Sequence, residues 1–235
     1  MNLLEIMSEL EALGTERTKK YYVGQGAKEP LFGVATGAMK PIAKKVKNNQ
    51  QLAEELYATG NFDAMYLAGM IADTKKMTPA DFDRWIGKAY FHMISDFIVA
   101  VTLAETDFSQ EVADKFIASE EELVKSAGWS CYEWLIGSRK DTEFDSSKLL
   151  SMLETVEKQI HSQPNRTRYA MNGFVVAVGI SYIPLHEEAL RTAERIGNVS
   201  IITGKGVCNA VSAFESIKSE TDKGRLGFKR KNVRC

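Results

Sequence analysis

The sequence predicts an all-α protein, because apolar residues recur at helical spacing through most of the chain and helix-capping residues precede several of these stretches. The first apolar stripe runs from Leu3 to Leu13 at intervals of three and four residues and ends at Gly14. Further stripes of this kind lie at 41–46, 52–57, 64–71, 94–103, 149–160, 169–183, 189–196 and 207–217.

Helix start signals recur immediately before these stripes. Asn61 precedes one of them, Asp145 precedes another, and Thr78 stands before Pro79. The Thr78-Pro79 pair is the clearest signal, because proline lacks the amide hydrogen that is left unpaired in the first turn of a helix. These signals predict helices that begin close to residues 62, 79 and 146.

Strand signals are few. Residues Val199–Thr203 are rich in β-branched side chains, but the segment is short and shows no partner, so we expect an extended connection there. Gly204-Lys205-Gly206 does not match a phosphate-binding loop, and it is interpreted as a turn before a helix.

Helices of about 10–16 residues joined by short polar turns predict successive antiparallel pairs. Pairs that repeat about every 40 residues are typical of HEAT-like repeats. We therefore expect a helical-repeat solenoid (an α–α superhelix), with one helix of each pair lining a concave groove wide enough for a duplex. The alternative is an irregular helical bundle. The predicted domain covers residues 1–220, and a basic C-terminal tail covers residues 221–235.

Charge is unevenly distributed along the chain. The tail at 221–235 has six basic residues and one acidic residue, a net charge of +5, whereas the rest of the chain carries −6. A basic tail can neutralise phosphates, and such binding weakens steeply with salt. Lys229, Arg230 and Lys231 are therefore candidate DNA-binding residues. The alternative is a basic tail that is simply solvated.

The segment 120–141 contains the residues that best fit a chemical role. Trp129 and Glu133 stand four positions apart, which places them on one side of a helix, and Tyr132 and Trp134 flank the carboxylate. An indole beside a carboxylate suits a cationic ligand, because both groups attract positive charge. The alternative is structural: Trp129 belongs to the core, and Glu133 pairs with a nearby basic residue such as Lys125, Arg139 or Lys140.

This segment resembles the AlkD-like DNA alkylation repair family, in which a helix carries a tryptophan and, four residues later, an acidic catalytic residue. The family's acid is usually aspartate, whereas this sequence has Glu133, which is one methylene longer. The resemblance implies that Glu133 and Trp129 are the catalytic pair. A displacement of about an ångström can lower a rate about 100-fold, so the substitution bears directly on activity.

A second similarity covers residues 164–174. In the family, an arginine near the start of this helix contacts the DNA backbone, and Arg168 occupies that place, with Arg166 two residues before it. The amides of a helix N-terminus also favour phosphate. The family's late aromatic residue is replaced here by a small residue near Ser212 or Ala213, and Phe214 is offset toward the core.

The resemblance implies a glycosylase that hydrolyses the N-glycosidic bond of cationic N3- or N7-alkylpurines in double-stranded DNA. The carboxylate would stabilise the developing sugar cation, and water would be the nucleophile, so we expect no cofactor. The three cysteines and three histidines show no ligand spacing, so we expect no metal. Two alternatives remain, namely a non-catalytic protein that binds unusual DNA structures and a protein-interaction scaffold.

We also expect a cytoplasmic protein. The first residues lack the basic and apolar pattern of a signal peptide, and no apolar stretch reaches the length of a membrane span.

Overall fold

The computed structural model describes residues 1–203 and 206–234, and helices dominate its architecture. The α-helices are α1 (Leu3–Leu13), α2 (Glu16–Gly24), α3 (Lys40–Val46), α4 (Gln50–Ala58), α5 (Phe62–Ile71), α6 (Pro79–Ile86), α7 (His92–Ile94), α8 (Ala100–Leu103), α9 (Ser109–Ile117), α10 (Glu122–Ile136), α11 (Ser146–Gln159), α12 (Asn165–Ser181), α13 (His186–Ile196) and α14 (Ala213–Asp222). A π-helical turn, η3 (Ser95–Val99), joins α7 to α8, so that 92–103 forms one helical segment.

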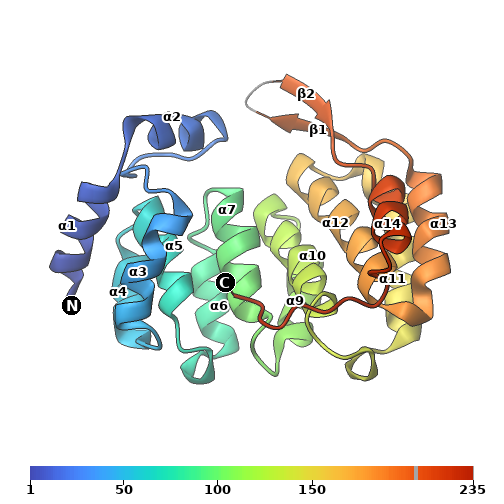
Figure 1. Ribbon diagram of the computed structural model, residues 1–235, viewed down its shortest axis with the longest axis horizontal. Coiled ribbons are helices and arrows are strands. Elements are labelled where there is room, and N and C mark those ends of the chain that lie inside the picture. Colours follow the sequence, from blue (N-terminus) through green and yellow to red (C-terminus); the bar gives the residue numbers. More distant parts are fainter. Residues whose placement is uncertain (204–205, 235) are drawn as a thin grey trace.

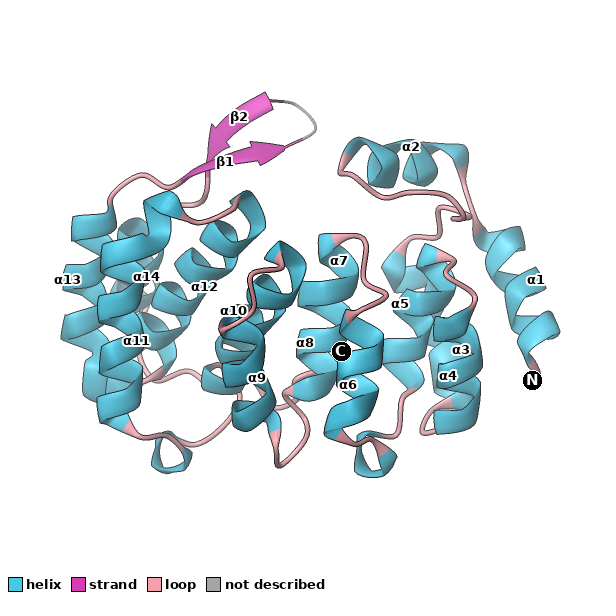
Figure 2. Cartoon of the chain, turned by 180° about the vertical axis from the view of Figure 1, so that it is seen from behind, coloured by secondary structure: helices cyan, strands magenta, loops and turns pink. Residues whose placement is uncertain are grey.

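The helices are arranged in two layers. The front layer, which faces the viewer in Figure 1, contains α3, α5, α7–α8, α10, α12 and α14. The back layer, seen in Figure 2, contains α4, α6, α9, α11 and α13. Each back-layer helix packs on the front layer, for example α9 on α10 and α4 on α5. The predicted all-α stack of antiparallel pairs is therefore confirmed.

Apolar faces of both layers meet in one continuous core, whose largest buried side chains include Trp85, Trp129 and Phe174. Burial of this apolar surface is the main source of stability, at about 25 cal/mol per Å² removed from water. None of the described helices is both long and apolar enough to cross a membrane.

The predicted helix starts are confirmed, and each has a physical cap. The Asn61 side chain accepts from the amides of Asp63 and Ala64, and Asp145 accepts from the amides of Ser147 and Lys148. Thr78 and Asp81 form a reciprocal capping box ahead of α6.

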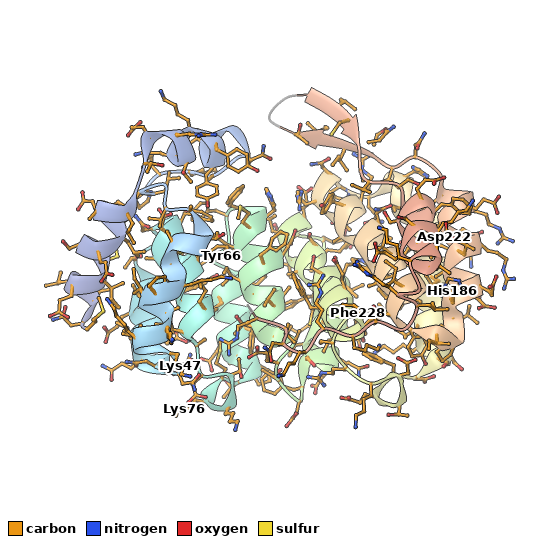
Figure 3. The ribbon with its side chains drawn as sticks, viewed as in Figure 1. Lys47, Tyr66, Lys76, His186, Asp222 and Phe228 are labelled. Atoms are coloured by element: carbon orange, nitrogen blue, oxygen red, sulfur yellow. The ribbon has the colours of Figure 1, made fainter. Side chains whose placement is uncertain are left out.

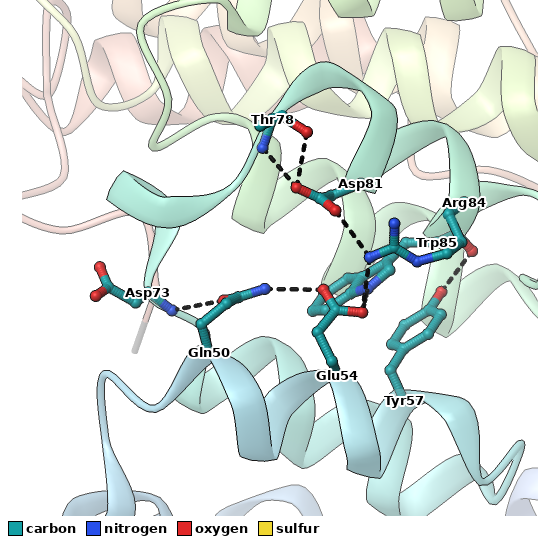
Figure 4. Close-up of polar contacts among 8 residues, drawn as sticks. All are labelled: Gln50, Glu54, Tyr57, Asp73, Thr78, Asp81, Arg84 and Trp85. Carbon is teal, nitrogen blue, oxygen red and sulfur yellow. Dashed lines mark hydrogen bonds and ion pairs between the residues drawn. The ribbon is translucent and has the colours of Figure 1, made fainter.

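A polar network joins the back-layer helices α4 and α6 (Figure 4). Glu54 accepts from the Arg84 guanidinium at 2.8 Å and from the Trp85 indole at 3.2 Å. The Tyr57 hydroxyl donates to the carbonyl of Trp85, and the two rings stack at 4.2 Å. These contacts set the spacing between neighbouring repeats.

Residues Val199–Thr203 differ from the expectation. Part of this segment is strand β1 (Ser200–Thr203), which pairs antiparallel with β2 (Gly206–Asn209), so it has the partner that the sequence did not show. The helical stripe expected at 207–217 is correspondingly shorter, because its first residues belong to β2 and α14 begins only at Ala213. Gly204 and Lys205 of the predicted turn, and Cys235, lie outside the described residues. Gly206 begins β2, so the element that follows the predicted turn is a strand and not the expected helix.

The hairpin and the C-terminal tail leave the layers at opposite ends of the front-layer helices (Figure 1). The hairpin lies beside the first turn of α12, where the Asn165 amide donates to the carbonyl of Ile202 at 2.9 Å. The tail crosses the other end of the front layer. The last four carbonyls of a helix lack partners within it, so the tail passes over unpaired acceptors.

Candidate nucleic-acid interface

Trp129 lies in the interior rather than on the front surface. Its side chain is 2% exposed and meets the ring of Phe174 from α12 edge-to-face at 5.2 Å. A ring in this position contributes to the packing of α10 on α12. The burial favours the structural alternative over the expected contact between Trp129 and a nucleotide.

Glu133 is held between the same two helices. A Cβ atom built on Gly173 of α12 would lie 2.4 Å from the Glu133 Oε2 atom, so the carboxylate occupies the space that this glycine leaves open. Burial raises the pKa of Glu133 to about 7, while the positive charge of Arg230 acts in the opposite direction. Trp129 and Glu133 thus share a helical side, as expected, but that side packs against α12.

The two aromatic residues beside Glu133 have different environments. Tyr132 is buried, and its hydroxyl donates to Asp114 at 2.7 Å, so it contributes to the α9–α10 contact. Trp134 is half-buried on the front layer, where its indole donates to the carbonyl of Asp96 at 3.2 Å. The Arg230 guanidinium lies 4.6 Å from the centre of the Trp134 ring. Of the tryptophan pair predicted on α10, Trp134 is therefore the one at the surface.

A buried ion pair near the centre of the front layer was missed by sequence reasoning. Asp96, on the π-helical turn, accepts from Ser95, Ser126 and the Arg166 guanidinium at 2.7, 2.9 and 3.1 Å. Burial raises the pKa of Asp96, and the charge of Arg166 opposes this shift. The only sequence signal was a carboxylate within the otherwise apolar stripe at 94–103.

The two arginines at the start of α12 are positioned differently. Arg166 is committed to Asp96 and also stacks on the Tyr169 ring at 4.5 Å. Arg168 is half-buried in the first turn, and its Nε atom is buried without a hydrogen-bond partner among the described residues. The Nε atom of Arg166 also lacks a partner among the described residues, so what distinguishes the two arginines is the Asp96 ion pair, which gives Arg166 a structural role.

The basic tail is docked rather than free. Lys229 donates to the carbonyl of Ile136 and pairs with Asp141, both at 2.8 Å. Arg234 donates to the carbonyls of Gly69 and Ala72 at the end of α5 and pairs with Glu105. Positive charge at helix C-termini is favourable because the helix dipole is negative there. Lys231, by contrast, is exposed.

The region of the expected late aromatic carries small residues. Ser212 caps α14 through the amide of Glu215, and Ala213 is buried. Phe214 is half-buried and packs against the core, as its offset predicted. The position that would place a second ring against a nucleotide is therefore taken by a helix cap.

Stacked antiparallel helix pairs with one helix of each pair in a common layer define a HEAT-like helical-repeat protein. The model of a family described as DNA alkylation repair enzymes matches residues 6–201. The chain belongs to this DNA alkylation repair family.

A solved structure is similar over the full length of both chains, with a TM-score of 0.95 and 60% sequence identity. It is described as a new family of proteins related to the HEAT-like repeat DNA glycosylases, with affinity for branched DNA structures. Uncharacterized protein Lin0241 of Listeria innocua is 31% identical over 91% of this chain and 95% of its own length. Uncharacterized protein Lmo0209 of Listeria monocytogenes is 29% identical over 92% of this chain and 97% of its own length.

Proposed function

We propose that this protein binds branched DNA without cleaving the glycosidic bond. The observation that carries the proposal is the packing of α10 on α12, which buries Trp129 and holds the half-buried Glu133 carboxylate against Gly173. A glycosylase of the expected kind needs both groups open to the damaged nucleotide. The similar solved structure, whose affinity is for branched DNA, supports the same function here.

Charge on the front layer supports phosphate contacts. Lys40 and Lys44 are exposed on α3, and the exposed Lys47, marked in Figure 3, follows the last residue of that helix. Lys231 and Arg230 add exposed positive charge on the tail. Each phosphate that is neutralised releases counterions, so we expect affinity to fall steeply as salt increases.

A glycosylase remains the second candidate, because one observation favours it. The Glu133 side chain is only half-buried, and its pKa is raised to about 7, which is a range used by general acids and bases. In that case the carboxylate would have to leave the α10–α12 interface when DNA binds.

Two assays on the same preparation separate these functions. Gel shifts compare a three-way junction with a linear duplex and a single strand of equal length, and a second assay measures base release from alkylated duplex. We expect tighter, salt-sensitive binding to the junction and base release no faster than without protein. Glu133→Gln should bind the junction as the wild type does.

Other outcomes of the two assays would refute the proposed function. Base release that Glu133→Gln abolishes would establish the glycosylase, and equal affinity for all three probes would refute a preference for branches. Absence of binding to any probe would favour a protein-interaction scaffold. Trp129→Phe serves as the packing control, because it retains an aromatic core residue and should leave DNA affinity unchanged.

A further inference from the structure

A cavity of about 300 Å³ lies in the front layer between α5, the η3–α8 segment and α10. Three aromatic side chains line it: Tyr66 from α5, Phe97 from η3 and Trp134 from α10. Figure 3 marks Tyr66 on α5, at the side facing α7. Met70 and Ile98 add apolar surface. The volume of the cavity is at the lower end of the range for small-molecule pockets.

The polar groups of the cavity are few and specific. Thr102 lines it, is fully buried, and its Oγ1 atom has no hydrogen-bond partner among the described residues. A buried hydroxyl without a partner is unfavourable, so it marks a place where a ligand could supply the missing bond. Lys40, which is exposed, belongs to the same lining.

We infer that this cavity receives one unpaired nucleobase of DNA, an inference that rests on the proposed binding of branched DNA. Aromatic rings bind bases of any sequence by stacking, and a hydroxyl can pair with either a donor or an acceptor on the base edge. Lys40 is placed to contact the attached phosphate. A base inside a duplex is covered by its neighbours, whereas a base at a branch point leaves the stack at lower cost.

The tail contributes to the same cavity. Val233 and Arg234 form part of its wall, and the Arg234 guanidinium is already bonded to helix carbonyls and to Glu105. Arg230, further back on the tail, covers one side of the Trp134 ring. This part of the wall is therefore already held in place by bonds within the protein, which reduces the entropy lost when a planar ring enters.

The test uses a three-way junction with a single unpaired 2-aminopurine at the branch and the same junction fully paired. Stacking on aromatic rings quenches 2-aminopurine, so wild-type protein should quench the unpaired probe on binding. Phe97→Ala should weaken binding to that probe at least about five-fold, the factor for loss of one base–aromatic stack, and leave the paired junction unaffected.

Two further variants test whether the effect of Phe97→Ala is specific to the cavity. Phe97 is 38% exposed and Leu150, on the back-layer helix α11, is 37% exposed, so Leu150→Ala controls for removal of a surface apolar side chain. Thr102→Val removes the unpartnered hydroxyl without changing volume, and we expect it to fold normally and bind the unpaired probe about two- to ten-fold more weakly.

Three outcomes would overturn the inference. The first is saturated binding of the unpaired probe without quenching, and the second is an equal effect of Phe97→Ala on both junctions. The third is equal quenching of free 2-aminopurine deoxyriboside, which would assign the cavity to a small metabolite. Failure of the wild type to bind any junction is a different result, and it would refute the proposed function itself.

Discussion

At the scale of single residues, the chemical behaviour of Glu133 depends more on its environment than on its being an acidic residue. The same carboxylate that resembles a catalytic acid lies against Gly173, half-buried, and burial raises its pKa to about 7 from an ordinary value of 4.5. Trp129, its expected partner, is buried on Phe174. Catalysis by Glu133 therefore requires that DNA binding moves its carboxylate out of the α10–α12 interface.

The pKa of Glu133 predicts a pH dependence of stability. The folded state holds this proton more tightly than the unfolded state, so the stabilisation is complete below about pH 4.5 and is lost as pH rises through about 7. We expect the free energy of unfolding of Glu133→Gln to exceed that of the wild type at pH 8 by more than at pH 5. Urea denaturation at the two pH values measures this difference.

Glu154→Gln, on the exposed surface of α11, is the control and should show no such change. A stability difference for Glu133→Gln that is identical at pH 5 and pH 8 would show that the carboxylate is ordinarily solvated.

At the scale of helices, the contact between α10 and α12 organises the centre of the molecule. It contains the Trp129–Phe174 ring pair and the close approach at Gly173, and the Arg166–Asp96 pair ties α12 to the π-helical turn. A buried ion pair of this kind fixes geometry, and removing one partner is expected to be destabilising by about 3–5 kcal/mol.

Gly173→Ala tests this contact. The added methyl group needs the space of the Glu133 carboxylate, so we expect the side chain to move toward solvent and the pKa of Glu133 to fall toward its ordinary value. An NMR titration of the Glu133 carboxyl measures the shift. The double variant with Glu133→Ala should be more stable than the sum of the single changes predicts, because the clash is gone.

Gly24→Ala is the matched control, since nothing lies within 4 Å of a Cβ at that position. An unchanged pKa in Gly173→Ala would mean that the two helices separate instead of displacing the carboxylate.

At the scale of the whole molecule, the tail links the ends of the front-layer helices. Gly227 donates to the carbonyl of Ile180 and Arg230 to that of Gly137, both at 2.7 Å, and Arg234 reaches the end of α5. The same segment supplies positive charge beside Trp134. We therefore propose that some basic residues of the tail attach it to the helix ends and that neighbouring ones attract DNA.

Lys229 and Lys231 separate the two roles. Lys229→Ala loses a carbonyl contact and an ion pair with Asp141, so we expect the free energy of unfolding to fall by about 1–3 kcal/mol. Lys231→Ala should leave stability unchanged, weaken DNA binding and reduce the slope of log affinity against log salt by about one. Thermal unfolding and salt-dependent gel shifts measure these effects. Equal effects of the two variants on stability would contradict the separate roles assigned to Lys229 and Lys231.

Much of the fold follows from local physics and was predictable. Stripes at helical spacing and the caps at Asn61, Thr78 and Asp145 determine where helices form, because a cap and a periodic apolar face act within a few residues. The β1–β2 hairpin was missed although only two residues separate its strands, because each strand is only four residues long and carries a weak strand signal. Its exposed β2 residues also imitate a helical stripe.

The sequence by itself determined the two-layered helical class, the family and the candidate residues on α10 and α12. Only the tertiary structure decided which of those residues face outward. The spacing of Trp129 and Glu133 places them on one side of a helix, but the packing of α12 determines whether that side meets solvent. The docking of the basic tail and the cavity at Phe97 likewise depend on segments far apart in the chain, which no local pattern records.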